Sequence, residues 1–273
     1  MGISPDLAKL IKSGLRGEHQ DQVDAHRHRL PNFIIIGAAK SATTTLTTIL
    51  PRHPDFFISK PKEPKFFGRF YDKGWDWYAK IFQNGEGKAF RGEGSTMYAS
   101  RLATFKQTPA LMHRYLPELK LIYIVRNPLD RIVSQWRHVK GRKSDVKDFA
   151  DLMRSRHLRK LIVGCSLYHQ QLERFRAVYP DQQIHCLTFE DLVRQPKPTM
   201  QALLQFLGAS DQVDSLLDNG QLPRENVAGD KGREMISKPE WPVGLRRRVV
   251  KVIQPDSERM LAYMGKPADF WSL

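Results

Sequence analysis

The feature that most constrains the fold is an apolar run at residues 33–36, which leads through a glycine turn into a helix-like segment at 41–50. The run reads Phe-Ile-Ile-Ile, with no polar residue on either face, which is typical of a strand buried on both sides. Residues 120–125 form a second such run, after which Asn127 can cap a helix and Pro128 can occupy its first turn. The chain therefore contains at least two strand–loop–helix units.

Further strand and helix candidates alternate along the chain. Strands are predicted at 56–59, 89–92 and 183–189, and helices at 75–82, 103–115, 166–179, 198–207 and 245–264. Such alternation favours a mainly parallel central sheet with helices on both faces. We therefore predict a single α/β domain over residues 31–273, preceded by a polar, loosely attached helical arm at 1–30.

Composition excludes several classes of protein. The chain has 273 residues, 41% of them hydrophobic, which is enough for a sizeable core and argues against a disordered chain. Its two cysteines, Cys165 and Cys186, are too few for a disulfide framework, and no stretch approaches the roughly 18 apolar residues of a membrane span. Because the first thirty residues also lack a signal-peptide pattern, these properties predict a cytoplasmic protein. The formal net charge of +15 favours anionic partners.

Residues 37–44, here called the glycine loop, have the chemistry of an anion-binding turn. They read Gly-Ala-Ala-Lys-Ser-Ala-Thr-Thr. Small residues let backbone N–H groups approach a phosphate, the start of the following helix adds its positive end, and Lys40 adds a full charge. The loop is shorter than that of P-loop ATPases, which place a second glycine directly before the lysine. Read alone, so short a motif is more often an ordinary turn with a solvated lysine.

Arg126 and Ser134 form a second candidate anion site. Arg126 follows the strand at 120–125, and Ser134 lies eight residues later on the helix that begins at Pro128. Ligands of doubly wound sheets bind at the carboxyl ends of the strands. This pair and the glycine loop could therefore hold two phosphates of one nucleotide. Taken alone, Arg126 could be an ion-pair partner and Ser134 a helix surface residue.

The two motifs together resemble those of sulfotransferases that use 3'-phosphoadenosine 5'-phosphosulfate (PAPS). The glycine loop resembles the 5'-phosphosulfate-binding loop, residues 123–134 resemble the 3'-phosphate-binding segment, and the similarity extends from about residue 32 to the C-terminus. The resemblance implies PAPS as co-substrate, no metal, and cofactor contacts from Ala39, Lys40, Ser41, Ala42, Thr43, Thr44, Arg126 and Ser134. Ala42 stands where the family commonly has glycine. We therefore expect the loop to avoid a positive φ there, because alanine adopts one only at a steric cost.

Residues 60–67, here called the Lys-Glu segment, are the candidate for proton transfer. They read Lys-Pro-Lys-Glu-Pro-Lys-Phe-Phe, and the adjacent lysines favour the ionised form of Glu63. The segment resembles the Lys-Glu-x-x-Phe-Phe element of glycan sulfotransferases, notably glucosaminyl 3-O- and N-sulfotransferases. That resemblance implies that Glu63 is the general base and that Lys62 is a charge near the transferring group. The alternative is a basic surface hairpin in which Glu63 is a counter-ion.

Two more segments resemble functional elements of the same family. The similarity at 91–98 implies that Glu93 and Tyr98 are acceptor contacts or alternative acid/base groups, although Glu93 could instead pair with a neighbouring cation. The basic loop at 226–233 resembles one that closes over the cofactor. It implies cofactor contacts from Lys231, Gly232 and Arg233.

These resemblances predict sulfuryl transfer from PAPS to a hydroxyl or amine of an acceptor, with a saccharide or glycolipid favoured. The expected partners are thus a nucleotide and a small acceptor, with neither nucleic acid nor a membrane span. Three other functions stay open. A nucleotide kinase or NTPase would need a Mg²⁺-binding acid at a second strand end, a nucleic-acid-binding protein would rely on net charge without a recognisable motif, and an inactive PAPS binder would lack turnover.

Overall fold

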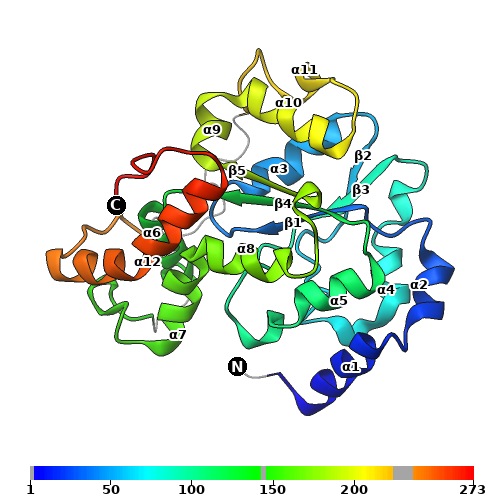
Figure 1. Cartoon of the computed structure of the whole chain (residues 1–273), viewed down its shortest axis with the longest axis horizontal. Helices are drawn as coiled ribbons and strands as arrows, with labels where there is room; N and C mark the ends of the chain where they lie inside the picture. Colours follow the sequence, from blue (N-terminus) through cyan, green and yellow to red (C-terminus); the bar gives the residue numbers. More distant parts are fainter. Residues whose placement is uncertain (1–2, 143–145, 224–235) are drawn as a thin grey trace.

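The computed structural model describes residues 3–142, 146–223 and 236–273 (Figure 1). At its centre is a five-stranded sheet made of β1 Phe33–Gly37, β2 Phe56–Ile58, β3 Phe90–Glu93, β4 Lys120–Val125 and β5 Ile184–Thr188. The helices are α1 Pro5–Arg16, α2 Gln20–His26, α3 Thr43–Ile49, α4 Gly74–Lys80, α5 Thr108–Tyr115, α6 Pro128–Lys140, α7 Arg156–Leu158, α8 Tyr168–Arg176, α9 Phe189–Arg194, α10 Pro196–Leu207, α11 Val213–Leu216 and α12 Val243–Tyr263. The predicted α/β class is confirmed, and each predicted strand is present.

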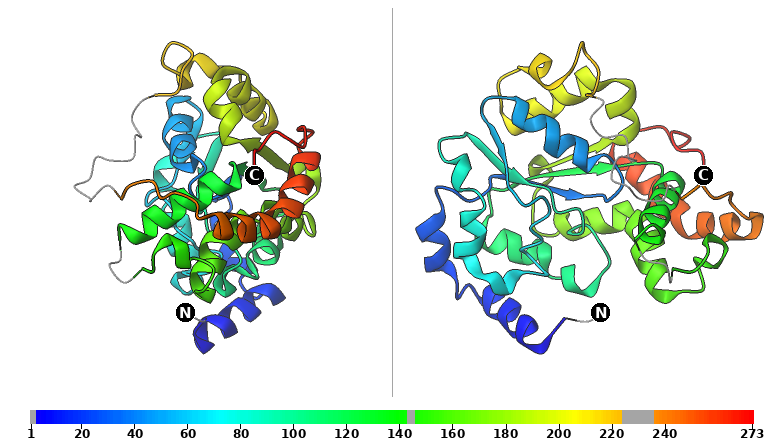
Figure 2. Two further views of the ribbon diagram at one scale, coloured as in Figure 1. Left: turned by 90° about the vertical axis from the view of Figure 1, so that its left-hand side faces the viewer. Right: turned by 180° about the vertical axis from the view of Figure 1, so that it is seen from behind.

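Every pair of neighbouring strands is parallel, and both faces of the sheet are covered. Successive residues of β1 pack into different clusters: Phe33 and Ile35 join the side chains of α3 and α10, whereas Ile34 and Ile36 join those of α4, α5 and α8. Figures 1 and 2 show these two groups of helices on opposite sides of the strands. Burial on both faces is the physical reason for the unbroken apolar run.

The strand order β2-β3-β1-β4-β5 places the functional segments together. The chain leaves β1 toward one side of the sheet to build β2 and β3, and then crosses to the other side of β1 to build β4. The carboxyl ends of β1 and β4 therefore flank the point where the order of strands reverses, which is where open α/β sheets form ligand crevices. Because all strands are parallel, the segments that follow β2 and β3 reach the same edge.

The start of α6 forms as its sequence predicts. The Oδ1 atom of Asn127 accepts hydrogen bonds from the backbone N–H groups of Leu129 at 2.9 Å and Asp130 at 3.3 Å. Pro128 occupies the first position of the helix, where no intrahelical N–H bond is needed. This cap fixes where β4 ends and α6 begins.

The N-terminal arm differs from the loosely attached segment that we expected. α1 and α2 are helical, but Ile11, Val23 and Leu30 are buried in the core cluster that includes α4 and α5. The backbone N–H of His19 also donates to the hydroxyl of Tyr115 at 3.2 Å. The expectation was wrong because it was based on the mostly polar composition of residues 1–30, whereas a few apolar residues are enough to attach these helices to the core.

The stretch after α6 holds elements that the sequence did not predict. α7 is followed by a π-helical turn at Arg159–Val163. Phe149 packs edge-on against Trp136 and Trp241, with ring centroids 5.4 and 4.7 Å apart. These aromatic residues belong to a hydrophobic cluster, separate from the two that cover the sheet, that joins α6 to the first half of α12. The cluster therefore supports the helix that carries Ser134.

Candidate active site

The glycine loop has a backbone that differs from our expectation at Ala42. This residue has φ 68° and ψ 20°, in the left-handed region, and Lys40 has φ 73°. The expectation that the loop avoids a positive φ at Ala42 is therefore wrong. The turn between β1 and α3 requires that conformation whichever residue occupies it, and alanine adopts it at a cost of roughly 1–2 kcal/mol.

Ser41 lies at the centre of this loop. Its side chain is fully buried, and its hydroxyl has no hydrogen-bond partner among the described residues. Buried hydroxyl groups normally have one. Thr43 is also buried, whereas Thr44 is exposed at the start of α3. A ligand atom that accepts a hydrogen bond would satisfy Ser41.

Arg126 is placed at the end of β4 by contacts on several sides. Its guanidinium lies over the ring of Phe189, 4.4 Å from the centroid, and its Nη2 is 3.9 Å from an oxygen of Asp130. Its carbonyl accepts a hydrogen bond from the Tyr168 hydroxyl at 2.8 Å. The Nε atom is buried and, within the described residues, has no partner. Ser134 lies half-buried two turns along α6.

Arg131 attaches α6 to the glycine loop. Its side chain is fully buried, and its Nη1 donates to the carbonyl of Ala39 at 3.2 Å. Its other donors bond the Ser166 hydroxyl at 2.6 Å and the carbonyl of Ile162. Within the described part of the chain, no carboxylate lies at ion-pair distance from this arginine. A buried cation whose partners are all neutral favours a nearby anion.

Five cations converge at this edge of the sheet. Burial lowers the pKa of Lys40, and the positive charges of Arg142, Lys62, Arg126 and Arg131 lower it further. Each of these four cations is thus close enough to Lys40 to affect it electrostatically. Such a concentration of positive charge is suited to a polyanionic ligand.

Sequence reasoning missed two of these cations. Arg131 is three residues before Ser134, so the two lie on the same face of α6, and this spacing was the signal for it. Arg142 follows the end of α6 and is exposed. Its position near Lys40 depends on the direction of α6 in space, for which the sequence holds no local signal.

Lys62 joins the Lys-Glu segment to the glycine loop. Its Nζ donates to the hydroxyl of Thr44 across the first turn of α3. Burial is the main reason that the pKa of Lys62 is lowered. The predicted catalytic lysine and the predicted cofactor loop are therefore in direct contact.

Glu63 lies beside this contact. One of its carboxylate oxygens accepts a hydrogen bond from the Thr96 hydroxyl at 2.9 Å, and the other is 3.0 Å from Nζ of Lys65. Its side chain is 26% exposed, so the carboxylate is held in place yet reachable from solvent. That combination is compatible with a group that accepts a proton from a bound molecule.

Glu93 and Tyr98 are buried, and Glu93 is close enough to Glu63 for the two charges to interact. Both side chains are 0% exposed, and the Tyr98 hydroxyl donates to Glu93 at 2.8 Å. The predicted role as direct acceptor contacts would need surface that these side chains do not present. The alternative pairing of Glu93 with a neighbouring cation also differs from the structure, in which hydroxyl groups surround its carboxylate.

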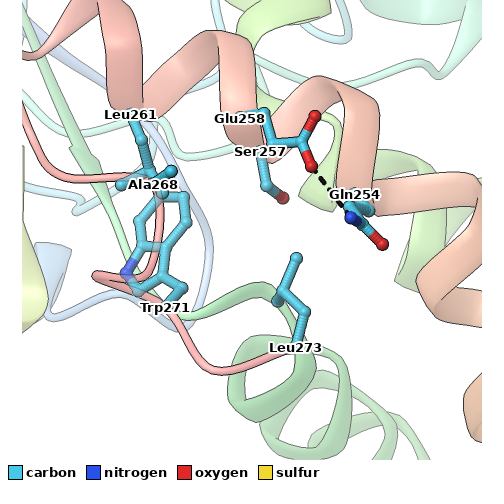
Figure 3. A pocket seen from close by; sticks show the side chains of 7 residues that line it. All are labelled: Gln254, Ser257, Glu258, Leu261, Ala268, Trp271 and Leu273. Atoms are coloured by element: carbon cyan, nitrogen blue, oxygen red, sulfur yellow. Dashed lines mark hydrogen bonds between the residues drawn. The ribbon is translucent and has the colours of Figure 1, made fainter.

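A pocket separate from the five cations lies between α12 and the C-terminal residues (Figure 3). It has a volume of about 200 Å³ and is lined by Gln254, Ser257, Glu258, Leu261, Ala268, Trp271 and Leu273. The Trp271 indole donates to Glu190 at 3.2 Å, and the other oxygen of Glu190 accepts from the backbone N–H of Asn127 at 2.8 Å. This end of the chain therefore braces the turn that follows Arg126.

The site is suited to a ligand that carries more than one anionic group. Ser41 and Arg126 have buried donors without partners, and the surrounding charge is positive. No group of three or more His, Cys, Asp or Glu side chains that could hold a metal ion occurs in residues 3–142, 146–223 and 236–273. The predicted contacts Lys231, Gly232 and Arg233 lie outside the described residues.

This geometry defines an α/β protein with a cation-rich candidate anion site at the carboxyl edge of a parallel sheet. Comparison with known proteins gives the family: the profile of the sulfotransferase domain matches residues 30–224. The chain belongs to this family, and the resemblance seen in its motifs is confirmed. The comparisons do not support the kinase or nucleic-acid-binding alternatives.

The chain is similar to several known sulfotransferases. The chain is 28% identical over 210 residues to human heparan sulfate glucosamine 3-O-sulfotransferase 3B1, covering 75% of this chain and 51% of that protein. It is 30% identical over 207 residues to human bifunctional heparan sulfate N-deacetylase/N-sulfotransferase 1, and the match covers 68% of this chain and 23% of that protein. A crystal structure of a sulfotransferase from Alicyclobacillus acidocaldarius superposes with a TM-score of 0.67 at 26% identity, covering 87% of this chain and 96% of that one. The chain spans about half the length of the human 3-O-sulfotransferases 3B1 and 3A1.

The predicted cytoplasmic location is wrong. The heparan sulfate sulfotransferases to which the chain is similar are Golgi-lumenal enzymes. A low cysteine count and short apolar runs report on disulfides and membrane spans, and neither property identifies a compartment. Among the helices of the described residues, none has the length and apolar character needed to cross a membrane.

Proposed function

We propose that this protein transfers a sulfuryl group from PAPS to a hydroxyl or amino group of a saccharide, with Glu63 as the general base. The observation that carries the proposal is the bond from Lys62 to Thr44. It brings the segment that holds a solvent-accessible carboxylate to the loop that is suited to the phosphosulfate. Family membership supports PAPS as the donor, and the names of the relatives support a glucosamine-containing glycan as the acceptor.

The reaction is an in-line displacement at sulfur. A lone pair of the acceptor oxygen or nitrogen forms the new bond to sulfur, while the bond between sulfur and the 5'-phosphate oxygen breaks. The electron pair of the broken bond stays on that phosphate, whose added negative charge Lys40 and the loop donors stabilise. Glu63 takes the acceptor's proton. The products are a sulfated saccharide and adenosine 3',5'-bisphosphate (PAP).

The cations and hydroxyl groups of the site divide into two groups in this proposal. Lys40, Ser41 and Lys62 lie where the 5' end of the nucleotide would bind, while Arg126 and Ser134 are offered for the 3'-phosphate. Arg131 holds the loop to α6 between them. Holding both ends of one nucleotide fixes its sulfur relative to Glu63, and such orientation is a large share of catalysis in transfer reactions.

The test is Glu63→Gln, assayed with radiolabelled PAPS and heparan sulfate as the acceptor. We expect turnover to fall roughly 10²–10⁴-fold, because a positioned base contributes that much. Calorimetry should show PAP affinity within about twofold of wild type, because in this arrangement the carboxylate does not contact the phosphates.

Glu118→Gln is the matched control, since Glu118 is exposed between α5 and β4 and should leave both quantities unchanged. Wild-type turnover in Glu63→Gln would remove Glu63 from the role of base. Incorporation of label into heparosan but not into heparan sulfate, or the reverse, would identify which form of the glycan is accepted.

A further inference from the structure

The Lys-Glu segment is held in place by side chains from another part of the chain. Glu63 and Lys65 have φ values of 59° and 52°, in the left-handed region that non-glycine residues seldom adopt. The backbone N–H of Lys65 donates to the Ser95 hydroxyl at 2.9 Å, and that of Phe67 donates to the Tyr98 hydroxyl at 3.2 Å. These bonds come from the stretch that follows β3, about thirty residues away.

Both hydroxyls donate in turn to Glu93. The Ser95 hydroxyl bonds one carboxylate oxygen at 2.5 Å, and the Tyr98 hydroxyl bonds the other at 2.8 Å. The Tyr78 hydroxyl also donates to that second oxygen, at 3.0 Å. Among the described residues, no cation lies at ion-pair distance from Glu93, so its only strong partners are hydroxyl groups.

This arrangement fixes the direction of every hydrogen bond in the network. A hydroxyl group has one hydrogen to donate, whereas an ionised carboxylate can only accept. Because Glu93 takes the hydrogens of Ser95 and Tyr98, their oxygen lone pairs face the backbone N–H groups of Lys65 and Phe67. Without an acceptor at Glu93, either hydroxyl could rotate and leave its N–H group without a partner.

We propose that Glu93 is a positioning residue for sulfuryl transfer: through Ser95 and Tyr98 it holds the backbone of the Lys-Glu segment in the conformation that presents Glu63. This inference rests on the proposed function, because it needs Glu63 to act as the base. Glu93 itself touches neither donor nor acceptor, since its side chain is fully buried. Its effect is therefore on the rate of the chemical step and not on nucleotide affinity.

Protonation of Glu93 gives this role a signature in pH. Burial raises the pKa of Glu93 to about 7, hydrogen bonds from Ser95, Tyr98 and Tyr78 oppose that rise, and the charge of Glu63 adds to it. The ionised form of Glu93, which can only accept hydrogen bonds, thus accumulates as pH rises through 7. We expect kcat to rise over the same pH range. Stability should change in the opposite direction: a carboxyl whose pKa is raised on folding stabilises the fold most at low pH and loses that contribution as pH rises through 7.

Two tyrosine variants give a matched comparison. Tyr98→Phe deletes the hydroxyl that links Phe67 to Glu93. Tyr179→Phe deletes a hydroxyl that is as deeply buried and donates to the carbonyl of Leu116 at 3.1 Å, outside this network. In Tyr98→Phe we expect kcat to fall roughly tenfold, because the variant loses both buried hydrogen bonds of that hydroxyl, with the KM for PAPS within about twofold. Tyr179→Phe should leave both constants unchanged.

Amide hydrogen exchange provides a readout that does not need the saccharide substrate. Exchange of the Phe67 N–H should accelerate in Tyr98→Phe and stay at the wild-type rate in Tyr179→Phe. In Glu93→Gln, the rise of kcat through pH 7 and the opposite fall of the thermal midpoint should both disappear. A purely structural role would change rate and stability in the same direction.

The outcomes separate this inference from the function on which it rests. Equal losses in the two tyrosine variants, or unchanged Phe67 exchange in Tyr98→Phe, would overturn the role of Glu93. A rise in the KM for PAPS without a fall in kcat would do so as well. If Glu63→Gln turns over normally while Phe67 exchange responds as expected, the base assignment fails and the network remains a structural support only.

Discussion

The glycine loop and the Lys-Glu segment meet at one edge of the sheet, yet they are held in different ways. Both contain non-glycine residues with positive φ: Lys40 and Ala42 in the first, Glu63 and Lys65 in the second. The glycine loop lies between β1 and α3, and its backbone pairs with β4 through a bond from the Ala38 N–H to the Ile124 carbonyl at 2.6 Å. The Lys-Glu segment follows a three-residue strand, and α4 begins only at residue 74.

The difference teaches that, in the proposed mechanism, phosphate binding and proton transfer depend on different kinds of structure. The anion-binding loop is shaped chiefly by the secondary structure on either side of it. The Lys-Glu segment, which carries the proposed base, is shaped by side chains that follow β3 and accept hydrogen bonds from its backbone. We therefore expect changes in the first region to act on nucleotide affinity and changes in the second to act on turnover.

Lys40→Ala should have the largest effect and tests the first half of this comparison. Removing a partly buried cation from the phosphosulfate site should weaken PAP binding roughly 10–100-fold, because charged hydrogen bonds are worth about 1.5–3 kcal/mol. Loss of charge stabilisation on the leaving phosphate should lower kcat by a further ~10²-fold. Calorimetry with PAP and steady-state kinetics measure the two parts. Unchanged PAP binding would contradict the assignment of the loop.

Arg131→Lys should have an intermediate effect, on affinity alone. Lysine keeps the charge but cannot bond Ala39, Ser166 and Ile162 together, because it lacks the planar fork of arginine. We expect PAP affinity to fall about tenfold, measured by calorimetry, with Phe67 exchange unchanged.

Arg174→Lys is its control. Arg174 also bonds several carbonyls, those of Ser100, Phe105 and Lys106, but it supports the packing of α8 and not the glycine loop. We expect Arg174→Lys to lower the thermal midpoint without loss of PAP affinity. If both variants weaken PAP binding equally, Arg131 has no special relation to the loop.

What could be predicted from the sequence follows the same division. The strands, the glycine loop and the Arg126 segment were accessible because each depends on residues close together in the chain, such as the Asn127 cap and the apolar run of β1. The hydrogen bonds that support the backbone around Glu63 could not be predicted from the sequence, because they join residues 65 and 67 to residues 95 and 98, about thirty positions away. Burial of Glu93 likewise depends on how α4 and the stretch after β3 pack in three dimensions.

The smallest expected effect comes from Ala42→Gly, and it tests whether the glycine loop is fixed by its flanking elements. Alanine at φ 68° costs roughly 1–2 kcal/mol, and glycine removes that cost while adding about 0.5–1 kcal/mol of unfolded-state entropy. The free energy of unfolding, measured with urea, should therefore rise by about 0.5–1 kcal/mol, with PAP affinity unchanged within about twofold. Ala110→Gly, within α5, should instead lower it by about 1 kcal/mol, because that position is helical. Equal destabilisation by both changes would show that Ala42 is not left-handed. In the proposed mechanism the same relief is not open to Glu63, because a glycine there would remove the base. The backbone of Glu63, with φ 59°, therefore depends on support from outside the segment.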